Sequence, residues 1–190
     1  MAVTETVARK RNAETTRAAL LKAALNRFVR EGYDGVSLRD IATDAGVDVA
    51  LVSRYFGGKL DLFAEVMATS PSPTHLFEGD HADFGERISA KLVIEKQESK
   101  DFDCLVIMLR SASSPDATEI IRRMGEERFY GPFAKWLGGR DAKIRARLVA
   151  DIIKGVTLDR VMAEDFGFTP DAREKFRARL ARTLQAAIDP

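Results

Sequence analysis

The sequence lacks the residues from which several classes of protein are built. Its one cysteine, Cys104, cannot form an internal disulfide, and it excludes a zinc site made of cysteines. No apolar run approaches the length of a membrane-spanning helix, and the N-terminus is polar and charged. We therefore expect a cytoplasmic chain with no signal peptide, no transmembrane segment and no membrane partner.

The chain also lacks the motifs of common catalytic sites. No serine lies in a nucleophile elbow, and Gly57-Gly58-Lys59 lacks the first glycine of a phosphate-binding loop and follows a predicted helix. His75 and His81 lie near acidic residues, but their spacing does not match two ligands on one helical face. We interpret that loop as polar surface, and we expect no enzymatic activity, no metal and no cofactor.

Neither sign of charge dominates, since 30 Lys and Arg residues oppose 29 Asp and Glu residues. The segment through Lys59 is mildly basic, with ten cations against seven acidic residues. Binding to a polyanion would therefore depend on a few well-placed cations and would weaken with salt. With 45% hydrophobic residues, 190 residues suffice for a small N-terminal domain and a larger core.

Two short helices are predicted between residues 37 and 56. Ser37 and Asp40 have the spacing of a capping box, so a helix begins at Leu38 and runs to Asp44 or Ala45. Gly46 supplies the left-handed backbone that ends a helix, and Asp48 can cap the next one. The pattern predicts two helices joined by a tight glycine turn.

A third helix, over residues 13–31, completes the predicted N-terminal domain. Leu21, Ala24, Leu25 and Phe28 follow the spacing of one buried helical face, and Gly32 ends the helix. Such a three-helix unit places the second helix of the pair in the major groove of double-stranded DNA. The residues then predicted to face the bases are Val49, Ala50, Leu51, Ser53 and Arg54.

Helical periodicity continues after this unit, so we predict an all-α fold of about nine helices. The expected helices cover residues 59–68, 83–98, 102–112, 116–137, 141–165 and 171–188. Ser70-Pro71-Ser72-Pro73 breaks the pattern and marks a domain boundary. The predicted organisation is a flexible basic tail over residues 1–12, a helix-turn-helix domain over 13–69, and a helical bundle for ligand binding and dimerisation over 70–190.

The order of these motifs resembles the tetracycline-repressor (TetR) family of bacterial transcription regulators. The resemblance covers roughly residues 15–65 and rests on three combined patterns. They are Phe28 with Gly32-Tyr33, Ile41-Ala42 with Ala45-Gly46-Val47, and Tyr55-Phe56-Gly57-Gly58-Lys59 followed by Leu60-Asp61-Leu62-Phe63. In combination these patterns are specific, although each alone is weak.

The resemblance implies a role for individual residues in DNA binding. It assigns phosphate contacts to Ser37, Tyr55 and Lys59, a groove edge to Arg39, and base contacts to Val49, Ala50, Ser53 and Arg54. The chain departs from many members by carrying Ser53 where they carry tyrosine. Its base preference therefore cannot be transferred from relatives. We expect such a protein to be nucleoid-associated.

The resemblance also implies a homodimer and a small-molecule effector. In the family the last two helices pair with their copies, and apolar stripes on both predicted helices fit such a face: Leu148, Ile152, Val156, Phe176, Leu180 and Leu184. The alternative is that these stripes close the core of one chain.

Apolar side chains between the domains suit a pocket for an apolar ligand, or equally a bundle core: Phe102, Met108, Met124, Phe129, Tyr130, Phe133 and Trp136. Gly125 and Gly131-Pro132 are expected to break the long helix over such a pocket.

Three hypotheses follow, in order of preference. The first is a repressor that a small apolar ligand releases from a palindromic operator. The second is a DNA-binding regulator or activator that responds to no ligand. The third is a helical enzyme or ligand carrier with a vestigial helix-turn-helix domain.

Overall fold

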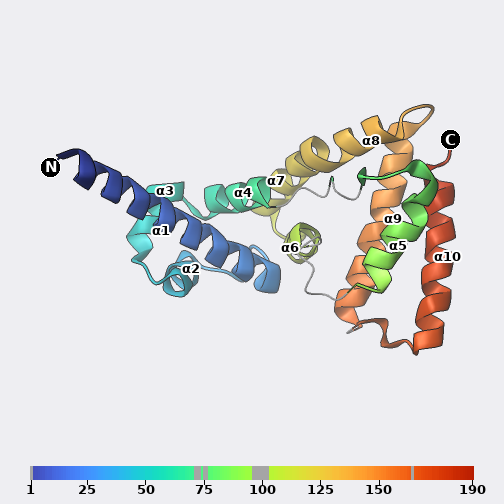
Figure 1. The fold of residues 1–190 in the computed structure, drawn as a ribbon. Helices are drawn as coiled ribbons and strands as arrows, with labels where there is room; N and C mark the ends of the chain where they lie inside the picture. Colours follow the sequence, from blue (N-terminus) through green and yellow to red (C-terminus); the bar gives the residue numbers. More distant parts are fainter. Residues whose placement is uncertain (1, 71–73, 75–76, 96–102, 164) are drawn as a thin grey trace. The chain divides into compact units, whose positions relative to one another are not determined.

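A computed structural model describes residues 2–70, 74, 77–95, 103–163 and 165–190 (Figure 1). These residues form helices joined by turns, with no strand among them. None of the helices described is both long enough and apolar enough to cross a membrane. The chain divides into two compact units, residues 1–70 with 107–121 and residues 71–106 with 122–190.

The first unit contains the predicted helix-turn-helix domain. Its N-terminal helices are α1 (Ala2–Glu31), α2 (Leu38–Ala45), α3 (Val49–Phe56) and α4 (Lys59–Thr69). The unit also takes in most of α7 (Pro115–Gly125) and the end of α6 (Asp103–Ser111), which the predicted division at residue 70 did not anticipate. Residues 2–12 belong to α1, so the prediction of a separate flexible tail over this stretch is wrong.

Aromatic side chains from α1, α4 and the turn after α1 form the centre of this unit. Phe28 and Phe63 are fully buried, and their rings meet edge to face with centroids 5.1 Å apart. The Tyr33 ring contacts Phe63 in the same manner, also at 5.1 Å. Such edge-to-face pairs add directional stabilisation to the burial of the rings. The cluster therefore holds α4 against α1 and fixes the turn at Tyr33.

The second unit is a helical bundle. Its elements are η2 (His81–Asp83), α5 (Phe84–Val93), η4 (Glu126–Tyr130), α8 (Gly131–Leu137), α9 (Ala142–Met162), η5 (Asp165–Gly167) and α10 (Pro170–Ile188). Figure 1 shows α5, α9 and α10 side by side, and their residues contact one another. The core includes the fully buried side chains of Phe84, Ile88, Phe133, Val149 and Leu184.

A glycine allows α5 and α10 to approach closely. A Cβ atom placed on Gly85 would lie 2.1 Å from the carbonyl oxygen of Ala181, a distance that no side chain tolerates. The Gly85 amide also donates a hydrogen bond of 3.0 Å to Oε1 of Gln185. Residue 85 therefore sets the distance between these two helices.

The predicted run over residues 116–137 is an irregular helix. It consists of α7, the π-helical turn η4 and α8, and it changes character at Gly125 and Gly131. The break predicted at these glycines does not occur, because both adopt the right-handed helical conformation and the helix continues through the π-helical turn. The predicted helix over 83–98 is α5, with Ile94 and Glu95 following it, and residues 96–102 lie outside the described part.

Candidate nucleic-acid interface

The start of α2 is fixed by the capping box that the sequence predicts. The Ser37 hydroxyl accepts a hydrogen bond of 3.2 Å from the Asp40 amide, and the Asp40 carboxylate accepts one of 3.0 Å from the Ser37 amide. Hydrogen bonds from the Ser37 hydroxyl and amide hold the pKa of Asp40 below its usual value. Gly46 ends the helix in the left-handed conformation, with φ of 67°. The boundaries Leu38 and Ala45 agree with the prediction.

The start of α3 is fixed by Asp48, whose Oδ1 atom accepts a hydrogen bond of 2.7 Å from the Ala50 amide. This cap satisfies one of the free amides of the first turn and orients the helix relative to the glycine turn. Val52 and Phe56 point inward and are buried. The sequence signals for the helix-turn-helix therefore correspond to contacts within the folded unit.

The opposite side of α3 is open to solvent. Val49, Ala50, Ser53 and Arg54 are exposed, whereas Leu51 and Tyr55 are half-buried. Arg39 on α2 is exposed as well. An eight-residue helix with its inner face buried and its outer face free has the form of a recognition helix.

Lys59, a predicted phosphate ligand, begins α4 and is half-buried. Its Nζ atom lies 4.3 Å from the centroid of the Tyr33 ring, a cation–π contact. The N-cap of this helix is Gly58, which provides no side-chain cap, so the amides of the first turn remain available. A cation beside open amides at a helix start suits a phosphate group.

Two arginines on α1 hold this unit together, and the sequence interpretation missed both. The guanidinium of Arg17 lies 5.0 Å from the Phe56 ring centroid and pairs with Glu65. Arg27 binds the Asp44 carboxylate through two hydrogen bonds, of 2.6 and 2.8 Å. A single arginine in an amphipathic helix gives no signal of a partner distant in sequence, which explains the omission.

The turn after α1 is anchored by residues from the junction of α6 and α7. The buried Tyr33 amide donates a hydrogen bond of 2.9 Å to the Ser111 hydroxyl, and Ser114 donates one of 3.0 Å to Asp34. At Gly32, φ is +69° and a Cβ atom would lie 2.4 Å from the carbonyl oxygen of Arg110. Gly32 therefore both ends α1 and allows this close packing.

Comparison with known sequences identifies the family. The description "Bacterial regulatory proteins, tetR family" matches residues 20–66, and "Tetracyclin repressor-like, C-terminal domain" matches residues 82–188. The chain belongs to the TetR family. The predicted family and all-α fold are therefore confirmed.

Individual relatives agree with this assignment. SrpR, an HTH-type transcriptional regulator of Pseudomonas putida, is 39% identical over 64 residues, which cover 34% of this chain but only 30% of SrpR. YezE, an uncharacterised HTH-type regulator of Bacillus subtilis, is 24% identical over 179 residues, 94% of this chain and 89% of YezE. The crystal structure of NalD, the secondary repressor of the MexAB-OprM multidrug efflux pump in Pseudomonas aeruginosa, covers 92% of this chain and 97% of its own. It shares the fold with a TM-score of 0.66 at 21% identity.

The aromatic residues predicted to line an effector pocket of this TetR protein mostly pack against one another. Phe133 is fully buried and stacks on Phe77 with centroids 4.1 Å apart, and Phe129 and Trp136 join the same cluster. Of the predicted set, only Tyr130 lines the cavity found between η4, α8 and α9. Met108 and Met124 belong to different units, and Phe102 lies outside the described residues. That some of the seven residues line an effector pocket therefore stays a prediction.

The predicted dimer residues also divide into two groups. Leu180 and Leu184 on α10 are buried in the core of the second unit, and Ile152, Val156 and Phe176 pack against that core. Assigning this α10 stripe to a partner subunit was wrong, because its side chains face the interior of the same chain. Leu148 on α9 is 51% exposed and remains available.

His81 belongs to the aromatic cluster rather than to a separate polar loop. Its ring centroid lies 3.8 Å from that of Trp136, and its Nε2 atom is 3.1 Å from the Trp136 carbonyl oxygen. His75 lies outside the described residues. These contacts give His81 a packing role.

Proposed function

We propose that this TetR-family protein is a DNA-binding transcriptional repressor that acts as a dimer on the nucleoid and leaves its operator when a small effector binds. The observation that carries the proposal is the exposed outer side of α3, with its inner residues Val52 and Phe56 buried and its start capped by Asp48. Such a helix meets the requirements for insertion into a major groove. NalD, which shares the fold, is itself described as a repressor.

The exposed side chains of α3 and its neighbours suggest which residues contact bases and which contact phosphates. Arg54 and Arg39 can each bind the O6 and N7 atoms of guanine through two hydrogen bonds. We assign phosphate contacts to Lys59 and to the half-buried Tyr55. Phosphate contacts position a protein on DNA without selecting a sequence. The Ser37 hydroxyl already takes part in the capping box, so its phosphate contact would be an additional one.

A stripe on α9 offers a face for a second copy of the chain. Ile144, Leu148, Leu158 and Met162 are all exposed, and Met162 reaches 75%. Together with Gly155 they lie three, four or seven residues apart and so share one side of the helix, with the charged Asp151 between Leu148 and Gly155 on that side. A Cβ atom on Gly155 would meet nothing within 4 Å, so a partner helix can approach closely there. A two-fold dimer built on this face predicts a roughly palindromic operator.

Release of DNA requires an effector that binds one arrangement of the dimer better than the other. By thermodynamic linkage, DNA then weakens effector binding by the same factor. The chain offers a covalent path for this coupling, because α6 and α7 each run from one compact unit into the other. Their junction anchors the turn after α1 through Ser111 and Ser114.

Selection of bound fragments from the source genome, followed by a mobility-shift assay, tests DNA binding. We expect Arg54→Ala to weaken binding to the selected site by about tenfold or more, since a bidentate guanine contact contributes roughly 1–3 kcal/mol. Arg123→Ala, which removes an exposed arginine of α7, is the control and should bind like the unmodified protein. Equal binding by both variants would remove Arg54 from the interface.

Light scattering tests the dimer face. Leu148→Glu should shift the protein to a monomer, because a charge at the centre of an apolar helix interface remains unpaired. Ile94→Glu is a matched control, since Ile94 at the end of α5 has the same 51% exposure. A dimeric mass for Leu148→Glu would place the interface elsewhere.

A further inference from the structure

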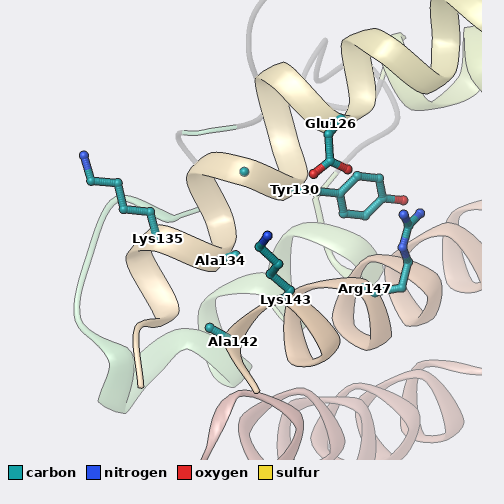
Figure 2. Close-up of a pocket in the computed structure, with 8 residues that line it drawn as sticks. Glu126, Tyr130, Ala134, Lys135, Ala142, Lys143 and Arg147 are labelled. Carbon is teal, nitrogen blue, oxygen red and sulfur yellow. The ribbon is translucent and has the colours of Figure 1, made fainter. Parts of the chain in front are cut away.

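A groove with cationic side chains lies between the irregular helix and the start of α9. Its volume is about 480 Å³, a size common for pockets that bind small organic molecules. Tyr130, Glu126 and Gly131 form one wall, and Lys143 and Arg147 of α9 form the other. Figure 2 shows Lys143 pointing from α9 towards η4 and α8, while Lys135 extends outward at the rim.

The wall opposite α9 exists because the helix changes its pitch there. In the π-helical turn the Gly131 amide hydrogen-bonds to the carbonyl oxygen of Glu126, five residues earlier. A Cβ atom on Gly131 would lie only 3.1 Å from that oxygen. The wide turn presents Glu126 and Tyr130 to the same groove. Single π-helical turns within helices occur frequently at functional sites.

The Tyr130 ring is held in place by two cations. The Arg147 guanidinium lies 3.9 Å from the ring centroid, and Lys154 Nζ is 3.3 Å from the phenolic oxygen. Phe129 supports the ring edge to face at 5.4 Å. One side of the groove is therefore an ordered aromatic surface beside a positive charge.

The charges facing the groove are not neutralised by the residues around it. Within the described part of the chain, Lys143 and Arg147 form no ion pair with an acidic side chain, and Glu126 pairs with neither of them. A negatively charged guest would gain from both cations. The carboxylate of Glu126 would disfavour a second negative charge and could accept a hydrogen bond from a neutral group. The groove therefore suits one negative charge on an organic body.

We infer that this groove binds a small organic monocarboxylate, whose carboxylate contacts Lys143 and Arg147 and whose apolar body lies along Tyr130, Ala134 and Ala142. The inference rests on the proposed function, because it gives the chemical class of the effector. It replaces the apolar ligand expected from sequence. Ile144 and Leu148 of the proposed dimer face alternate along α9 with Lys143 and Arg147, so an occupant would lie beside that face.

Matched acids and amides test the charge requirement. Calorimetric and ligand-observed NMR titrations of the full chain would compare benzoate with benzamide, 2-naphthoate with 2-naphthamide, and hexanoate with hexanamide. We expect at least one acid to bind about fivefold or more tightly than its amide, since hydrogen bonds to charged groups are stronger than neutral ones. If no acid binds better than its amide, the inference is wrong.

Two variants of opposite expected effect locate the site. Lys143→Gln should weaken binding of the preferred acid by about fivefold, whereas Glu126→Gln should strengthen it, because it removes a repulsive charge. Lys175→Gln, on an exposed turn of α10, is the control and should leave binding unchanged. General damage to the fold would weaken binding in both groove variants. Unchanged binding in both would contradict the assignment.

DNA binding is measured separately, so that the two proposals can fail independently. Mobility shifts with the preferred acid present should show weaker binding to the selected operator, and Lys143→Gln should remove this response without changing binding in its absence. If the protein binds the acid but its affinity for DNA does not change, the groove is a binding site for the acid, but the acid is not the effector. A protein that binds the acid but no DNA would contradict the proposed function alone.

Discussion

The helix-turn-helix unit and the C-terminal bundle differ in the range of the interactions that specify them. In the first unit, Ser37 with Asp40, Gly46, and Asp48 with Ala50 act over two to five residues and set the helix boundaries locally. In the second unit, the decisive contacts join α5 to α10, about a hundred residues apart in the sequence. An amphipathic stripe in that unit predicts that its apolar side chains are buried, but it does not predict which helix they pack against.

The largest predicted effect tests the corrected role of the α10 stripe. Leu184→Ala should lower the free energy of unfolding by about 3–4 kcal/mol, because it leaves a cavity in a fully buried site. It should leave the dimeric mass unchanged. Denaturant unfolding and light scattering measure these two properties. Leu148→Ala should instead reduce the dimeric mass and leave the free energy of unfolding nearly unchanged. If Leu184→Ala lost the dimer without losing stability, the α10 stripe would belong to the dimer interface after all.

A smaller effect compares two glycines that lie in the helices of the second unit. Gly85→Ala should destabilise the protein by about 2–3 kcal/mol, since the added methyl group collides with the Ala181 carbonyl and forces α5 away from α10. Gly155→Ala meets open space and should stabilise the isolated chain by about 0.5–1 kcal/mol. We expect it to weaken dimerisation. Similar unfolding midpoints for the two variants, measured on monomeric protein, would contradict this packing.

The cap of the recognition helix should contribute less to stability. Asp48→Ala removes the acceptor for the Ala50 amide and should cost about 1 kcal/mol. Hydrogen exchange should show faster opening of α3 and little change in the second unit. Asp48→Ser keeps a capping oxygen and should recover most of the protection. Equal exchange rates in the two variants would mean that the cap does not hold α3.

The smallest effect concerns the pair between α1 and α2. Hydrogen bonds from Arg27 lower the pKa of Asp44 from its ordinary value near 3.8. Because the folded pKa is the lower one, this stabilisation is present above the unfolded value and is lost as the pH falls through the folded value. Asp44→Asn should slightly lower the thermal midpoint at pH 7. The difference from the unmodified protein should shrink below about pH 4, and an unchanged difference at pH 3 would contradict the assignment.

The sequence predicted the helix-turn-helix fold of the first unit and the exposed outer side of α3, because caps and turns are local. Gly46 and Asp48 could be interpreted without knowing any distant partner. The sequence could not predict that Arg17 contacts Phe56, that Ser111 anchors Tyr33, or that Leu184 faces α5, since each depends on segments brought together by the whole fold. The glycines at 125 and 131 suggested an irregular helix there, but nothing in the sequence indicated the cationic groove beside it, because Lys143 and Arg147 come from another helix.

The comparison of selected binding sites for the unmodified protein and for Ser53→Tyr tests the central claim most directly. Ser53 is exposed on the outer side of α3, so a tyrosine there should change the preferred bases within each half-site. The spacing between half-sites should stay the same, because the dimer face on α9 is untouched. Identical base preferences in the two selections would contradict the claim that this side of α3 contacts the bases.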